Sequence, residues 1–117
     1  MYDNLPVVKL GLVATSRDCF PIQLSAKRKA AVVDAYTKAG GEIVDIPTII
    51  ESETDAMKAL EEVKANGCNA LVVFLGNFGP ETPETLIAQR FEGPCMYVAA
   101  AEGDGDMING RGDAYCG

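Results

Sequence analysis

Apolar residues along this chain gather in short continuous runs that alternate with segments of helical spacing. The runs predict four β-strands, at residues 7–13, 42–46, 70–76 and 95–100. Strands without alternating polar positions are typical of a parallel sheet whose two faces are both covered by helices. Pro47 is expected to end the second strand, because a proline within such a run disfavours its continuation.

Three segments between these strands have apolar residues at the spacing of a helix. They are residues 24–39, about 54–65 and 84–91. The apolar side predicted for the first helix consists of Ala30, Ala31, Val33, Ala35 and Tyr36. Ser25 is the expected N-cap of that helix, and Thr54 with Asp55 is expected to open the second.

The resulting order of elements, β-α-β-α-β-α-β, has crossovers so short that the strands must be parallel, with right-handed connections. The sequence therefore predicts an α/β, flavodoxin-like three-layer sandwich with a parallel sheet of strand order 2-1-3-4. Residues 1–117 are expected to form one domain. Sheets of this type usually have five strands, and Asp113 has the character of a helix N-cap close to the chain end. We therefore expect a fragment truncated before its last elements, with a frayed tail as the alternative.

The net charge of −7 argues against nucleic acid and anionic membranes as partners, because phosphate binding needs clustered lysine and arginine. The one basic cluster, residues 27–29, is interpreted as a solvated helix face. No segment resembles a signal peptide or a membrane span, so a cytoplasmic location is expected. The chain has no histidine, and its four cysteines form no CxxC pair, which argues against a zinc site.

Two loops are expected to meet where the strand order reverses, which is where open parallel sheets bind ligands. They are residues 14–22 and 76–82. The side chains expected to face one another there are Arg17, Asp18, Cys19, Phe20, Asn77, Phe78 and Glu81. Such a mixture suits a polyhydroxylated small molecule, whose hydroxyls need donors and acceptors while its C–H face lies on a ring. The alternative is structural: Arg17 pairs with Asp18 at the surface, and the two phenylalanines cap the core.

Other functions of this topology do not fit the loops. A flavin-phosphate loop would be rich in glycine, serine and threonine, whereas residues 14–21, ATSRDCFP, contain no glycine and place Asp18 where it would repel a phosphate. A phosphoacceptor domain would need an aspartate at the end of the third strand, where this chain has Gly76 and Asn77. The glycine-rich residues 103–113 match neither a dinucleotide fingerprint nor a calcium loop in their spacing, and are interpreted as turns.

Three long strings resemble the N-terminal domain of the L-fucose isomerase and L-arabinose isomerase superfamily, particularly its L-fucose isomerase-like members. They are GLVATSRDCFP (11–21), LVVFLGNFGPETPETL (71–86) and AAAEGDGDMINGRGDAYCG (99–117). The resemblance implies a multidomain, homo-oligomeric aldose–ketose isomerase of carbohydrate metabolism, which works through an enediol with a divalent metal, usually Mn²⁺. Its metal ligands come from later domains, so this chain alone is not expected to be active.

The resemblance also implies that strand-end loops of this domain complete the active site of a neighbouring subunit. The residues expected to contact the sugar are Arg17, Asp18, Phe20, Asn77 and Phe78. No catalytic residue and no metal ligand is expected within the chain, and Glu81 is assigned to interdomain packing. The alternative function is a stand-alone, flavodoxin-like sugar-binding module without catalysis.

Overall fold

The computed structural model of the chain describes residues 4–17 and 19–101. Its elements are β1 (Leu10–Thr15), α1 (Ile22–Lys38), β2 (Ile43–Ile50), α2 (Glu53–Ala65), β3 (Ala70–Leu75), α3 (Glu81–Arg90) and β4 (Cys95–Ala99). Strands and helices alternate as the sequence predicts. The glycine-rich segment after β4 and the N-cap expected at Asp113 lie outside the described residues.

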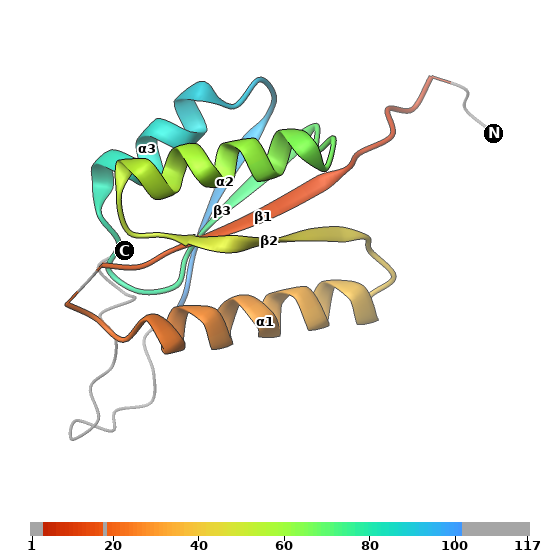
Figure 1. Cartoon of the computed structure of the whole chain (residues 1–117). Coiled ribbons are helices and arrows are strands. Elements are labelled where there is room, and N and C mark those ends of the chain that lie inside the picture. The colour runs from red at the N-terminus through yellow and green to blue at the C-terminus, as the bar shows by residue number, and fades with distance from the viewer. Residues whose placement is uncertain (1–3, 18, 102–117) are drawn as a thin grey trace.

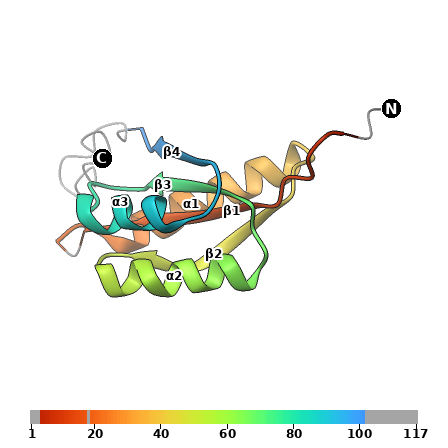
Figure 2. The same cartoon turned by 90° about the horizontal axis from the view of Figure 1, so that it is seen from above.

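The four strands form one parallel sheet in the order β2-β1-β3-β4, which confirms the predicted fold class and strand order. Figure 1 shows the sheet between α1 on one side and α2 with α3 on the other. Helices α2 and α3 pack against each other, and Figure 2 shows this layer from above. The molecule is therefore a three-layer α/β sandwich with β1 and β3 at its centre.

The core consists of two clusters, one on each face of the sheet. Val13 and Val73 belong to the cluster under α2 and α3, whereas Leu12 and Phe74 belong to the cluster on the α1 side. Successive residues of a strand point to opposite faces, so a strand covered on both sides must be apolar at every position. This explains the continuous apolar runs, and each fully buried valine or leucine contributes about 1.5–3 kcal/mol to folding.

Strand β1 begins and ends later than the sequence predicts. Val7 and Val8 are 86% and 61% exposed and precede the sheet, because pairing with β2 and β3 starts only at Leu10. At the other end, Ala14 and Thr15 belong to the strand rather than to a loop. The expected loop of residues 14–22 is thus shortened to the segment between Thr15 and α1.

Strand β2 continues through Pro47 to Ile50, so the predicted end at this proline is wrong. Between the pairs Leu12↔Asp45 and Ala14↔Ile49, β2 advances four residues while β1 advances two. Proline is tolerated at such an irregularity of an edge strand, where its missing N–H breaks no pairing in the sheet.

Helix α1 begins at Ile22 and has Pro21 as its N-cap, so the prediction of Ser25 as N-cap is wrong. Ser25 is buried and its hydroxyl donates to the Thr15 carbonyl at 2.7 Å. The predicted apolar side is also largely wrong, since Tyr36 is 41% exposed and the three alanines are exposed. The side facing the sheet carries Ser25, Lys29, Val32 and Val33. Helical spacing alone did not distinguish these two sides of α1.

The N-termini of α2 and α3 both lie earlier than expected. Ser52 caps α2 by accepting a hydrogen bond from the Asp55 N–H at 3.2 Å, in place of the predicted start at Thr54. Helix α3 starts at Glu81, directly after Pro80, rather than at Glu84. Glu81 and Glu84 therefore lie three residues apart in the first turn, where neighbouring side chains can interact.

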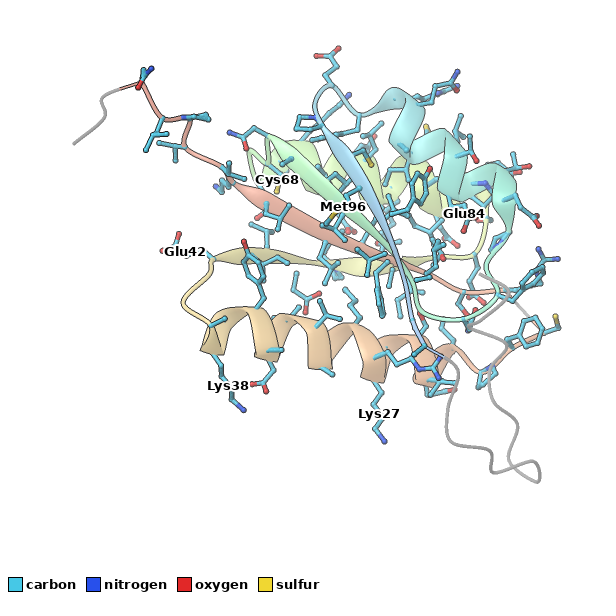
Figure 3. The ribbon with its side chains drawn as sticks, turned by 180° about the vertical axis from the view of Figure 1, so that it is seen from behind. Lys27, Lys38, Glu42, Cys68, Glu84 and Met96 are labelled. Carbon is cyan, nitrogen blue, oxygen red and sulfur yellow. The ribbon has the colours of Figure 1, made fainter. Side chains whose placement is uncertain are left out.

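Lys29 ties α1 to the irregular part of β2. Its ammonium group donates to the Ile46 carbonyl and lies 2.5 Å from the Asp45 carboxylate, and the residue is only 6% exposed. The basic cluster is thus not a uniformly solvated face: Lys29 is buried, whereas Lys27 projects away from the sheet (Figure 3).

We expect Lys29→Met to lower the free energy of unfolding by about 1–3 kcal/mol, because it leaves a buried carbonyl without a donor. The matched control is Lys38→Met, which removes the exposed ion pair of the same helix with Asp34 (2.8 Å) and should cost at most about 1 kcal/mol. Urea unfolding of both variants measures the difference. Equal effects of the two substitutions would contradict the role given to Lys29.

Candidate functional site

The candidate site begins where β1 and β3 end side by side. Thr15 is paired with Leu75 at the last position of their common register. Beyond the sheet, the backbone N–H of Arg17 donates to the Asn77 side-chain oxygen at 3.1 Å. The two predicted loops therefore meet at the carboxyl ends of the strands, as the sequence analysis expects.

Asn77 is fully buried and connects the two loops through its side chain. Besides accepting from Arg17, its amide nitrogen donates to the Ser16 hydroxyl at 2.8 Å and to the Pro21 carbonyl at 3.4 Å. Both polar atoms of the side chain thus have partners inside the protein. The geometry makes Asn77 a positioning residue for Arg17, and a direct contact with sugar stays a prediction.

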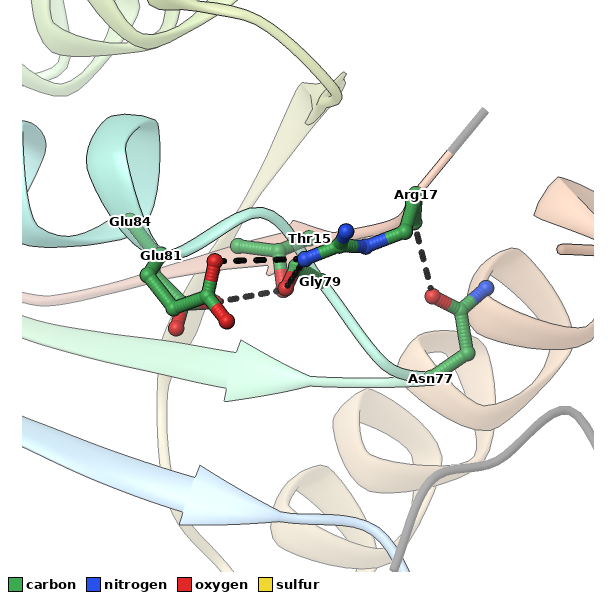
Figure 4. A network of polar contacts seen from close by, with 6 residues as sticks. All are labelled: Thr15, Arg17, Asn77, Gly79, Glu81 and Glu84. Carbon is green, nitrogen blue, oxygen red and sulfur yellow. Dashed lines mark hydrogen bonds and ion pairs between the residues drawn. The ribbon is translucent and has the colours of Figure 1, made fainter. Parts of the chain in front are cut away.

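The guanidinium of Arg17 lies across the second loop (Figure 4). Its Nη2 donates to the Gly79 carbonyl at 3.2 Å and to Glu81 Oε2 at 3.2 Å, and its Cζ lies 4.5 Å from the centre of the Phe78 ring. A cation over an aromatic face is attracted by the ring quadrupole. Arg17 is therefore held at one edge and on one face, with 31% of its side chain exposed.

Two half-buried phenylalanines form the apolar part of the site. The rings of Phe20 and Phe78 meet edge to face, with centroids 6.1 Å apart and an interplanar angle of 73°. Four of the predicted sugar-contacting residues are thus brought together, and Asp18 lies outside the described residues. Arg17 pairs with Glu81. The assignment of Glu81 to interdomain packing remains untested.

Glu84 belongs to the same network and was not singled out from the sequence. Its Oε2 accepts a long hydrogen bond, 3.5 Å, from the Thr15 hydroxyl (Figure 4). Burial raises the pKa of this carboxyl above its usual value, and the charge of Glu81 raises it further, while Thr15 and Arg17 lower it in part. If the sequence analysis had started the helix at Glu81, it would have placed Glu81 and Glu84 together on the first turn.

Glycine is required at two positions of the second loop, because neighbouring side chains lie too close for a Cβ atom. A Cβ atom on Gly79 would lie 2.5 Å from the Thr15 hydroxyl oxygen and 2.9 Å from Glu84 Oε2, and one on Gly76 would overlap the Ser25 side chain. The Gly76 carbonyl in turn accepts from Arg28 Nη1 at 2.8 Å. A side chain at Gly79 would push the second loop away from the end of β1, and one at Gly76 would push it away from α1.

The described residues do not fit a metal site. Within residues 4–17 and 19–101, no group of three or more Cys, Asp or Glu side chains could hold a metal ion, and the chain has no histidine. No helix in the described part of the chain is both long and apolar enough to span a membrane. The chemistry available at the strand ends is that of hydrogen-bond donors, carboxylates and aromatic rings.

Residues 11–117 match the family model of the fucose/sulfoquinovose isomerase N-terminal domain. The chain belongs to this family. It is thus a sugar isomerase-related domain, which confirms the resemblance found in its strand-end strings. A segment of 85 residues, 69% of the chain, is also 29% identical to Glycine dehydrogenase (decarboxylating) 1 of Colwellia psychrerythraea, but it covers only 9% of that protein.

We expect Asn77→Ala to lower the free energy of unfolding by about 2–3 kcal/mol, because it leaves buried partners unpaired and opens a cavity. The control is Asn66→Ala, at the exposed C-terminal end of α2, whose amide donates to Glu62 O at 2.8 Å and whose loss should cost about 1 kcal/mol or less. Urea unfolding measures both. A loss no larger than that of the control would show that Asn77 does not hold the loops together.

The stability of the fold should fall as the pH rises through the range in which Glu84 loses its proton. Folded Glu84 binds its proton more tightly than unfolded Glu84, because its pKa is raised, so ionisation costs the folded state more. Glu84→Gln should therefore gain stability relative to wild type as the pH rises above the ordinary carboxyl pKa of about 4. Glu61→Gln, an exposed carboxylate on α2, should show no such gain. The measurement is the free energy of unfolding as a function of pH. Parallel curves for wild type and Glu84→Gln would exclude the effect.

Proposed function

We propose that this chain is the N-terminal domain of a metal-dependent aldose–ketose isomerase that works as a homo-oligomer. In this proposal the loops after β1 and β3 contact the sugar in the active site of a neighbouring subunit. The family match over residues 11–117 is the observation that carries the proposal. The convergence of Arg17, Phe20 and Phe78 at the strand ends supports it, since this edge is where parallel sheets bind ligands.

Arg17 is suited to orient a sugar rather than to react with it. Its guanidinium is fixed by Gly79, Glu81 and Phe78, so it presents donors in a preset direction. Holding a substrate in its reactive geometry lowers the entropic part of the barrier. In this role Arg17 donates to a sugar hydroxyl and acts as a substrate-binding residue.

The phenylalanines would form the apolar part of the binding surface. The rings of Phe20 and Phe78 are half-buried and stand at a large angle, so they offer an apolar corner to the C–H face of a sugar. Apolar walls also limit the access of water to an enediol. Asp18, which lies outside the described residues, is proposed as an additional sugar contact from the same loop.

The metal and the general base are proposed to lie outside this chain. The described residues hold no suitable ligand set, so Mn²⁺ of the complete isomerase would be bound by Glu, Asp and His side chains of other domains. When bound, the metal would polarise the sugar oxygens during isomerisation. The part of this chain is to position the substrate.

We expect Arg17→Ala to lower kcat/KM of the full-length isomerase about 10- to 100-fold, because a charge-assisted hydrogen bond contributes about 1.5–3 kcal/mol. The assay is aldose-to-ketose conversion with Mn²⁺ across L-fucose, L-arabinose and related sugars. The control is Arg90→Ala, an exposed arginine on α3 whose Nη1 contacts the Met57 sulfur.

Two results would change this proposal. Unchanged conversion by Arg17→Ala, with normal thermal unfolding, would keep the family but reduce the loop to a structural element. Conversion of no aldose by the wild-type protein would favour a sugar-binding module without catalysis.

A further inference from the structure

The guanidinium of Arg17 already donates hydrogen bonds within the protein through Nη2, an atom that arginine usually uses to bind anions. A guanidinium makes bidentate contacts through two edges, one formed by Nε with Nη2 and the other by Nη1 with Nη2. Nη2 belongs to both edges and carries one hydrogen for each. The availability of Nη2 therefore decides whether Arg17 can bind a carboxylate, phosphate or sulfonate in a bidentate manner.

In the described structure, Nη2 already donates to two acceptors. Gly79 O and Glu81 Oε2 lie 3.2 Å from Nη2, and Nε is buried without a hydrogen-bond partner among the described residues. Nη2, which both edges share, is therefore engaged by the protein itself in this arrangement. The remaining donors on Nη1 suit single hydrogen bonds, of the kind that a sugar hydroxyl accepts.

The charge around Arg17 also disfavours an anion. Glu81 pairs with the guanidinium while 75% of its side chain remains exposed, so a solvent-accessible negative charge lies directly beside Arg17. Glu84 adds a second carboxyl one helical turn further on, in the same network. An incoming anion would meet like charge at the position of its intended partner, and such a juxtaposition costs affinity.

We infer that this site selects neutral sugars over sugars with an anionic substituent at the position facing Arg17, and that Glu81 is the specificity-determining residue. The inference rests on the proposed sugar-binding function and names its substrate class. The family description includes both a neutral sugar, fucose, and a sulfonated one, sulfoquinovose. The geometry of Arg17 places this chain with the neutral class.

The test compares the two sugars in the full-length isomerase. Sulfoquinovose is added as a competitive inhibitor of fucose isomerisation, which gives its Ki. The quantity compared between variants is this Ki divided by the KM for fucose. We expect this ratio to be about tenfold or more in the wild type and to fall about tenfold in Glu81→Ala. That substitution leaves Nη2 with the Gly79 carbonyl as its one acceptor among the described residues, which allows a bidentate contact with the anion, and it removes a repulsion. Glu81→Gln keeps an acceptor but no charge and should lie between them.

The matched control is Glu61→Ala, which removes an exposed carboxylate from α2 and should leave the ratio at its wild-type value. Tighter binding of sulfoquinovose than of fucose by the wild type would overturn the inference. A ratio that is the same in Glu81→Ala and Glu61→Ala would overturn it as well.

Direct measurement of sugar binding distinguishes failure of the proposed isomerase function from failure of this inference. If no aldose is converted, the isomerase proposal fails, and dissociation constants of the same two sugars from calorimetry still decide whether Glu81 excludes the anion. Binding of neither sugar would overturn both proposals.

Discussion

The unshifted parallel pairing of β1 with β3 aligns the strand ends, and the candidate site depends on that alignment. Thr15 faces Leu75 in the last pair, so the following loops start at the same level and leave the sheet together. The buried side chain of Asn77 then extends the connection beyond the strands by bonding to both sides of the first loop. A buried amide with all partners present is costly to disrupt, and it therefore specifies one arrangement of the loops.

The contacts of Arg17 differ in what they contribute. Stacking on Phe78 and the bond to Gly79 fix the guanidinium against the protein. The ion pair with Glu81 is largely exposed, and such pairs contribute only about 0–1 kcal/mol to stability. The larger effect that we infer for it is on recognition, because it engages Nη2, the donor that both anion-binding edges of the guanidinium share. A carboxylate of little value for folding can in this way decide which ligand is accepted.

Much of the site could be predicted from the sequence because its position follows from topology. Continuous apolar strands imply a parallel sheet, and the strand order then places residues 14–22 and 76–82 at one edge. Arg17, Phe20, Asn77 and Phe78 were named on this basis and lie together. Glu84 was missed because the start of α3 was placed three residues too late.

The sequence by itself determined the alternation of elements, the fold class and the family, because these depend on hydrophobic periodicity and on long strings of residues. The tertiary structure decided where elements begin and end and which polar groups are buried. Lys29 and Ser25 can face the sheet because each donates a hydrogen bond to a strand carbonyl there. Lys29 donates to a carbonyl of β2, and Ser25 to one of β1. Pro47 stays within β2 because that strand lies at the edge. Such outcomes depend on partners distant in sequence, which local patterns do not contain.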